Sequence, residues 1–252
     1  MSSARSLLLA SVALCTGAST AFASDLPTTK GPPPPPVAAP YSWTGFNVGL
    51  QGGYGWGVEN DDLSTADFLG VIGLFADHFS AAGPIGGAHV GYDQQLGSLV
   101  LGVRSELDAS GLHGSTVASS TVCSEGCTVT DASLAFHNTW QAFLLGRGGV
   151  AFDRLLVYVT GGVAFGDDRE SVTITQTGSS TGVWTGSQTK TLVGGAIGLG
   201  ADYALDQHWR IGAEWRYVSF GKGDYSAIGP STVAYKAGFS ENLALFDVSY
   251  GF

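Results

Sequence analysis

Along most of the chain after residue 40, hydrophobic and polar side chains alternate one by one. Successive side chains of a β-strand point to opposite faces, so this alternation predicts strands with one apolar and one polar face. The last segment, residues 242–252 (NLALFDVSYGF), places Phe246, Val248, Tyr250 and Phe252 on its apolar face. A chain that ends on a strand with two aromatic side chains is unusual for a soluble domain.

The same alternation predicts eight strands. They cover residues 42–57, 86–95, 99–109, 138–150, 155–166, 190–203, 209–220 and 242–252. In the fifth strand both faces are apolar, and the pattern does not decide which of them points inward. Eight is an even number, as a closed antiparallel barrel of one bacterial chain requires. Taken alone, each segment also fits a strand of a soluble β-sandwich.

The predicted connections between these strands alternate in length. Short ones lie near residues 96–98, 152–154 and 205–208, and long ones near residues 58–84, 110–137, 167–189 and 221–238. Short periplasmic turns and long extracellular loops are typical of outer-membrane barrels, whereas a soluble sandwich has no reason to separate its loops by length. We therefore predict an all-β chain that forms an eight-stranded antiparallel up-and-down transmembrane β-barrel.

The N-terminal segment predicts export. It carries one positive charge, Arg5, followed by a mostly small and apolar run and by an A-x-A cleavage site (AFA) at residues 21–23. These features indicate a signal peptide over residues 1–23, too short to cross a bilayer as a helix. Residues 24–40 are rich in proline and predict an extended periplasmic linker. Residues 41–252 are then the outer-membrane β-barrel domain.

Composition and charge agree with an exported barrel. Only 13% of the residues are charged, 38 are glycine, and the formal net charge is −10. Mean hydropathy is +0.18, yet the chain has no run of about 18 uncharged apolar residues that could form a transmembrane helix. Strands with an apolar residue at every second position explain both observations. The acidic balance argues against nucleic acid as a partner.

Two cysteines, Cys123 and Cys127 in the segment CSEGC, remain after removal of the signal peptide. An oxidising compartment favours a disulfide between them. A metal pair is the alternative, but no histidine or further cysteine lies at ligand spacing, so we predict the disulfide. The acidic pair Asp61 and Asp62 lacks the spacing of an EF-hand. We predict no metal ion and no cofactor.

A set of charged residues is predicted to face the inside of the barrel. They are Arg104, Glu106, Asp108, Arg147, Asp202, Arg210, Glu214 and Arg216. Buried charges are tolerated when they are paired, and both signs are present, so these residues predict a hydrogen-bonded plug. The alternative is a polar pore whose charges select ions. The interior of an eight-stranded barrel is just wide enough for side chains to fill, which favours the plug.

Five histidines are scattered through the chain, and His113 and His137 bracket the second long loop, with Ser110, Ser115 and Ser133 nearby. A histidine beside a serine would be needed for a lipid-modifying enzyme. Serines are common in loops, however, and the chain has no G-x-S-x-G segment. We therefore predict no catalytic residues and no enzymatic activity.

Four segments resemble one known family: WTGFNVG at residues 43–49, GYGWG at 53–57, AFDRLLVYVTGGVAFG at 151–166 and AEWRYV at 213–218. They are similar to those of the small porin-like outer-membrane β-barrel family, which includes opacity-like and related bacterial surface antigens. The resemblance implies an eight-stranded barrel in the outer membrane of a Gram-negative bacterium. It also implies that the C-terminal aromatic strand is the signal for the barrel-assembly machinery. The cysteine pair and a long first loop that is apolar at residues 68–75 depart from the family.

We interpret the chain as a structural, surface-exposed protein that contributes to envelope integrity. Its expected partners are outer-membrane lipid and lipopolysaccharide, the barrel-assembly machinery, and an extracellular ligand that binds through the loops. A narrow porin for ions or small solutes is the first alternative hypothesis. A lipid-modifying outer-membrane enzyme is the second.

Replacing Phe252 with aspartate is expected to impair insertion, because a charge would then end the apolar face that contacts lipid and the assembly machinery. The measurement is the amount of folded, protease-protected protein in isolated outer membranes, with Phe252→Leu as the apolar control. Wild-type amounts of the inserted aspartate variant would contradict this prediction.

Overall fold

The computed structural model describes residues 41–252 except 63–78, 124–125, 180 and 229–231. The predicted signal peptide, the linker and the apolar part of the first long loop lie outside the described residues. Within the described part, the strands are β1 (Gly45–Asp62), β2 (Phe79–Leu96), β3 (Leu99–Ser110), β4 (His113–Cys123), β5 (Cys127–His137), β6 (Trp140–Phe152), β7 (Leu155–Gly178), β8 (Gly182–Ala204), β9 (Trp209–Phe220), β10 (Gly223–Ile228) and β11 (Thr232–Gly251). No helix among these residues is long and apolar enough to cross a membrane.

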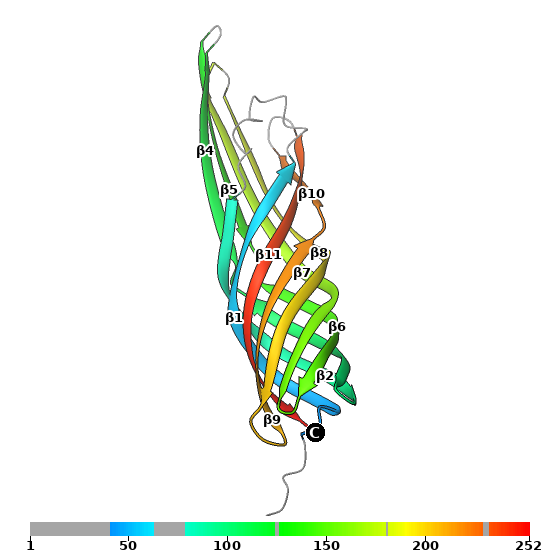
Figure 1. Cartoon of the computed structure of the whole chain (residues 1–252). Helices are drawn as coiled ribbons and strands as arrows, with labels where there is room; N and C mark the ends of the chain where they lie inside the picture. Colours follow the sequence, from blue (N-terminus) through cyan, green and yellow to red (C-terminus); the bar gives the residue numbers. More distant parts are fainter. Residues whose placement is uncertain (1–40, 63–78, 124–125, 180, 229–231) are drawn as a thin grey trace, which may run out of the picture. The chain divides into compact units, whose positions relative to one another are not determined.

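Eight of the strands pair in a closed antiparallel ring, in the order β1, β2, β3, β6, β7, β8, β9, β11 and back to β1 (Figure 1). The ring closes between β1 and β11, whose register runs from Asn47 opposite Gly251 to Asp62 opposite Lys236. A closed sheet has no edge, so the backbone N–H and C=O groups of these strands are paired within the sheet. The predicted eight-stranded antiparallel barrel is confirmed.

The loops predicted at residues 110–137, 167–189 and 221–238 are largely strands, so this part of the prediction is wrong. The β4–β5 hairpin, the second half of β7, the first half of β8, β10 and the first part of β11 account for most of these residues. β5 pairs with the second half of β7, and β4 pairs with β5. We name β4, β5 and the parts of β7 and β8 between residues 167 and 191 the sheet extension. It projects from the barrel at the end opposite the C-terminus (Figure 1).

The sheet extension has the composition of loops but the alternation of strands. In β7, for example, Val172 and Ile174 are separated by Thr173 and followed by Thr175. The apolar side chains turn inward and join a buried cluster with Leu134, Phe136, Trp184 and Phe239, among others. Threonine is β-branched and favours strands once a neighbouring strand supplies hydrogen bonds and packing. Those neighbours are distant in the sequence, which is why composition alone suggests loops.

Tight turns join the strands at the end of the barrel where the C-terminus lies. Gly97 and Asp153 adopt left-handed backbone conformations, with φ of 68° and 55°. In the third turn the Asp206 carboxylate accepts hydrogen bonds from the backbone N–H groups of His208 and Trp209, at 2.7 and 2.8 Å. These two bonds lower the pKa of the Asp206 carboxyl, because they favour its ionised form. The short connections predicted from the sequence are therefore turns.

Alternation along each ring strand separates an apolar outer wall from a filled interior. Large exposed hydrophobic side chains such as Phe46, Leu50 and Phe246 belong to the outer wall. The structure also shows which side chains point inward in the predicted strand at residues 155–166, where both faces are apolar. Leu156 and Tyr158 are buried inside the barrel, whereas Leu155, Val157 and Val159 are exposed on the outer wall.

A small apolar cluster fills the interior near the tight turns. It consists of Tyr41, Trp43, Val100, Leu156, Tyr158 and Ala204. Trp43 is fully buried, and its indole N–H donates to the carbonyl oxygen of Asp153 at 3.2 Å. A larger cluster, described above for the sheet extension, fills the opposite half. Polar and charged side chains fill the interior between these clusters.

The Trp43→Ala variant is expected to lose about 3–5 kcal/mol of unfolding free energy, because it leaves a cavity in the cluster at the turn end. The measurement is urea unfolding of the barrel in phospholipid vesicles, followed by circular dichroism. Trp215→Ala is the matched control, since Trp215 is 48% exposed on the outer wall and lipid fills the space it vacates. Equal losses for the two variants would refute this account.

Candidate functional site

The eight charged residues predicted to face the lumen all lie inside the barrel. They project from β3, β6, β8 and β9, and none of them is more than 5% exposed. Their positions alternate with outward apolar residues, so the pleat of each strand turns them inward. We call this set, together with the polar side chains that contact it, the lumen network.

Arg216 holds two carboxylates at the centre of the lumen network. Its guanidinium binds both carboxylate oxygens of Glu106, with Nη1–Oε2 at 2.6 Å and Nη2–Oε1 at 3.0 Å. The same group contacts Oε1 of Glu214, at 2.9 Å from Nε and 2.8 Å from Nη2. The ring of Phe143 lies beneath it, with the guanidinium carbon 4.7 Å from the ring centroid. A planar, bidentate pairing of this kind is the most favourable geometry for a buried arginine.

A second group of contacts lies nearer the tight turns. Nη2 of Arg147 contacts the Asp202 carboxylate at 2.5 Å, and Nε of Arg147 lies 3.7 Å from the Asp93 carboxylate. Nη1 of Arg210 contacts Asp93 at 3.3 Å, and its Nε donates to the hydroxyl of Tyr41 at 2.6 Å. Arginine side chains therefore link the charged layer to the apolar cluster below it.

Arg104 joins the two groups. Its guanidinium lies 3.8 Å from Glu106, 3.9 Å from Asp202 and 3.9 Å from Glu214. The lumen network is thus continuous across the barrel. Each strand supplies only one to three of its members, so the pairs exist only when the ring is closed.

Several members of the lumen network were absent from the predicted set. Asp93 contacts two arginines, and Gln51 donates to Glu106 and to both oxygens of Asp108, at 2.8–3.1 Å. The amide of Asn47 donates to Asp93 at 3.1 Å. These residues occupy inward positions in the alternating pattern of their strands, and this pattern could have predicted that they face the lumen. Their partners depend on the register between strands, which the sequence does not display.

Carboxylates outnumber arginines in the lumen network. The buried carboxylates of the ring below the sheet extension are Asp93, Glu106, Asp108, Asp202, Glu214, Glu241 and Asp247, and the buried arginines are Arg104, Arg147, Arg210 and Arg216. Within the part of the chain that the structure describes, no arginine forms an ion pair with Asp108, Glu241 or Asp247. The lumen network therefore contains three more carboxyl groups than arginines.

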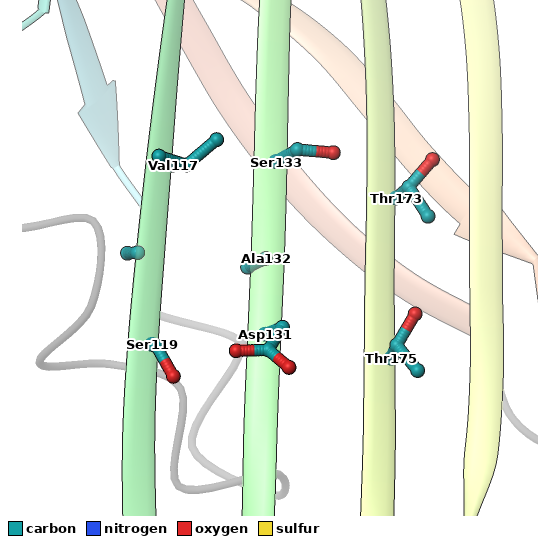
Figure 2. Close-up of a pocket in the computed structure, with 8 residues that line it drawn as sticks. Val117, Ser119, Asp131, Ala132, Ser133, Thr173 and Thr175 are labelled. Carbon is teal, nitrogen blue, oxygen red and sulfur yellow. The ribbon is translucent and has the colours of Figure 1, made fainter.

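The outer face of the sheet extension is rich in hydroxyl groups. Figure 2 shows Ser119, Ser133, Thr173 and Thr175, with Asp131, on three neighbouring strands around one open hollow of about 370 Å³. We call the outward surface around these residues the hydroxyl face. At the tip of the hairpin the structure joins Cys123 and Cys127 in a disulfide. Two strands of the hydroxyl face, β4 and β5, are therefore linked covalently at their connected ends.

The two histidines that bracket the second predicted loop are direct neighbours in the sheet. His113 on β4 lies opposite His137 on β5, and both side chains are exposed. Nδ1 of His113 lies 2.9 Å from the carbonyl oxygen of Gly111. Among the described residues, no serine hydroxyl forms a hydrogen bond with either histidine, so the arrangement lacks the hydrogen-bonded pair of an activated serine.

The predicted assembly signal lies on the outer wall. Phe246, Val248 and Phe252 are 69%, 48% and 74% exposed, and Tyr250 packs against Trp209 with ring centroids 5.3 Å apart. The backbone N–H of Phe252 donates to the carbonyl oxygen of Phe46. The C-terminal strand therefore presents an aromatic surface directly beside the seam between β1 and β11.

Replacing Arg147 with methionine is expected to lower the free energy of unfolding by about 3–5 kcal/mol, because Asp202 loses its nearest cation while remaining buried. Urea unfolding in phospholipid vesicles measures the loss. The double variant Arg147→Met with Asp202→Leu is expected to recover at least half of it, since both charges are then gone. A single variant as stable as the wild type would show that this pair is not essential to the interior.

Residues 9–250 match the model of the family described as outer membrane protein beta-barrel domain. The chain is 31% identical over 246 residues to the "31 kDa outer-membrane immunogenic protein" of Brucella melitensis, which covers 93% of this chain and 95% of that protein. It is 26% identical to the "22 kDa outer membrane protein" of Rhizobium leguminosarum, over 86% of this chain and 82% of the relative. Among solved structures it is similar to OprG from Pseudomonas aeruginosa, with 13% identity, a TM-score of 0.46, and coverage of 83% and 96%. The chain belongs to the outer membrane protein β-barrel family and resides in the outer membrane of a Gram-negative bacterium.

Proposed function

We propose that this protein is a closed structural barrel that contributes to envelope integrity and presents its sheet extension at the cell surface. The observation that carries the proposal is the lumen network, in which Arg216 binds Glu106 and Glu214 while Arg147 binds Asp202. These pairs lie where a channel would have to pass. The barrel then acts through its two surfaces, one toward lipid and one toward the outside, rather than through its lumen.

The size of the barrel supports a closed lumen. An eight-stranded barrel has an interior that side chains alone fill. A hydrated ion could pass only if pairs such as Arg216 with Glu106 separated, and an isolated buried charge is costly. The apolar cluster around Trp43 adds a second barrier near the tight turns. Both barriers consist of side chains from different strands and therefore strengthen the ring that they fill.

The surface role rests on the sheet extension and on the relatives. Relatives named as outer-membrane immunogenic proteins span nearly the full length of this chain, and we infer a similarly exposed surface here. The hydroxyl face in Figure 2 offers many hydrogen-bond donors and acceptors to an external ligand. Lipopolysaccharide is the expected partner at the membrane, and the barrel-assembly machinery is the expected partner of the outward aromatic residues on β11.

A narrow cation pore is the second candidate function. The surplus of carboxylates in the lumen network, with Asp108, Glu241 and Asp247 not paired to arginine, favours this alternative. Negative side chains in a narrow lumen attract cations and repel anions. If the lumen conducts at all, the current is therefore expected to be carried by cations.

Planar bilayers containing the folded protein are expected to stay silent, because paired side chains block the lumen. Single-channel recording is the measurement, and protease protection of the same sample establishes that the protein is inserted. The Arg147→Gln variant tests whether any current depends on the lumen network, with Arg154→Gln in a tight turn as its control. Uniform, ion-selective steps that shift only with Arg147→Gln would replace the closed barrel with the pore.

A further inference from the structure

Three nitrogen-containing side chains form a row on neighbouring strands at the outer face of the sheet. His113 on β4 lies opposite His137 on β5, and His137 lies opposite Arg169 on β7. All three side chains are exposed. Directly opposed residues have Cβ atoms about 5 Å apart, so one ligand can contact several of them. We call these residues the outer basic row.

Arg169 is the permanent cation of this row. The described residues contain no carboxylate that forms an ion pair with it, so its guanidinium is open to an external anion. The Nδ1–H of His113 donates to the carbonyl oxygen of Gly111 at 2.9 Å, so Nε2 of the neutral ring is an acceptor, and the groups suited to an anion are Arg169 and His137. A guanidinium fork beside an imidazole group suits phosphate oxygens, which accept two parallel hydrogen bonds from arginine. In a chain with a net charge of −10, such a row is a local feature rather than part of a general positive surface.

A shallow hollow of about 620 Å³ lies on the outer wall below the outer basic row. Its floor consists of small residues, with Gly86 and Ala88 on β2 and Ala109 on β3, and its sides include Leu50 and Trp140. The strand register places Gly86 beside Ala109, and Ala109 opposite Trp140. Because this wall faces lipid, the hollow suits an acyl chain, whose burial is favourable wherever the wall is recessed.

The strands of the row continue strands of the hollow, because β4 follows β3 and β5 precedes β6 along the chain. His113 follows Ala109 by four residues, through a connection held by the hydrogen bond from Gly111 N to Pro84 O, and His137 precedes Trp140 by three. At the rise of a β-strand, the row lies roughly 10 Å beyond the upper side of the hollow. Aromatic rings of outer-membrane barrels gather at the level of the lipid head groups, and Trp140 is an exposed aromatic side chain of this wall. We therefore expect the basic row to lie near the depth of lipid phosphates.

Above the row begins the hydroxyl face of the sheet extension. Ser115 follows His113 on the same face of β4, and Ser171 follows Arg169 on the same face of β7. Figure 2 shows the continuation of this face, with Ser133 and Thr173 on the middle strands. Hydroxyl groups in this density suit the hydroxyls of a sugar. From the membrane outward, one wall thus offers an apolar hollow, a phosphate-binding row and a sugar-binding face.

We propose that this wall binds one lipopolysaccharide molecule of the outer leaflet. An acyl chain lies in the hollow, a phosphate of the glycolipid contacts Arg169 and His137, and the sugars extend over the hydroxyl face. The inference deepens the proposed function and rests on its surface-contact part, not on whether the lumen conducts. A free phosphate would use only the row, and a phospholipid would leave the hydroxyl face without a partner.

The test is binding of fluorescent lipopolysaccharide to the full mature chain in phosphatidylcholine nanodiscs. Arg169→Gln is expected to weaken binding about tenfold, because it removes the charged fork. Ala88→Leu, which fills the hollow, is expected to weaken binding as well. Arg154→Gln and Ala213→Leu are the matched controls, since they make the same changes in a tight turn and on another part of the outer wall. Circular dichroism establishes that every variant is folded.

Competition identifies the source of the phosphate. Intact lipopolysaccharide is expected to displace the probe far better than its deacylated, still phosphorylated saccharide or inorganic phosphate. Equal displacement by the deacylated saccharide would overturn the lipid site, and variants that bind as tightly as their controls would overturn the whole proposal. Because binding is measured without current, a conducting lumen would refute the closed barrel and leave this result intact.

Discussion

The pairing of β1 with β11 is the interaction on which the rest of the structure depends. Lipid offers no hydrogen bonds, so a sheet in the membrane must leave no backbone edge, and the seam between the first and last strands removes it. The C-terminal strand is therefore both the final piece of the wall and an aromatic lipid-facing surface. Everything inside and above the ring, from the lumen network to the sheet extension, is positioned by that closure.

Closure creates an interior that has to be filled, and this chain fills it in layers. An apolar cluster around Trp43 lies near the tight turns, charged and amide side chains follow, and a second apolar cluster continues into the sheet extension. A buried ion pair repays its desolvation only when further hydrogen bonds satisfy the remaining groups. Arg216 meets that condition with four contacts to two carboxylates, whereas Glu241 and Asp247 form no ion pair with the arginines of the described interior. The stability of the barrel therefore depends on how completely its inward charges are paired.

Beyond the barrel, the strands of the sheet extension remain hydrogen-bonded to one another, although water could satisfy their backbone groups there. The sheet extension keeps the alternation of the wall but replaces outward apolar residues with serine and threonine, as expected of a sheet face that meets water. Its inner face buries an apolar cluster that includes Leu134, Ile174 and Trp184, and it also buries Asp168 and Glu170. The boundary between the two kinds of outer face is where His113, His137 and Arg169 lie side by side. This change in the chemistry of the outer face along one continuous sheet is the basis of the proposed lipopolysaccharide site.

The sequence by itself determined the class of fold and the inward set of charges, because a period of two assigns each side chain to a face without knowledge of its neighbours. Trp209 to Phe220 is an example, since the predicted strand and β9 have the same bounds. It did not determine the sheet extension, because serine and threonine form strands only when distant segments supply partners. Nor did it determine which charges meet. Asp93 reaches Arg147 and Arg210 only through the register of non-adjacent strands around the closed ring, and that register is a property of the tertiary structure.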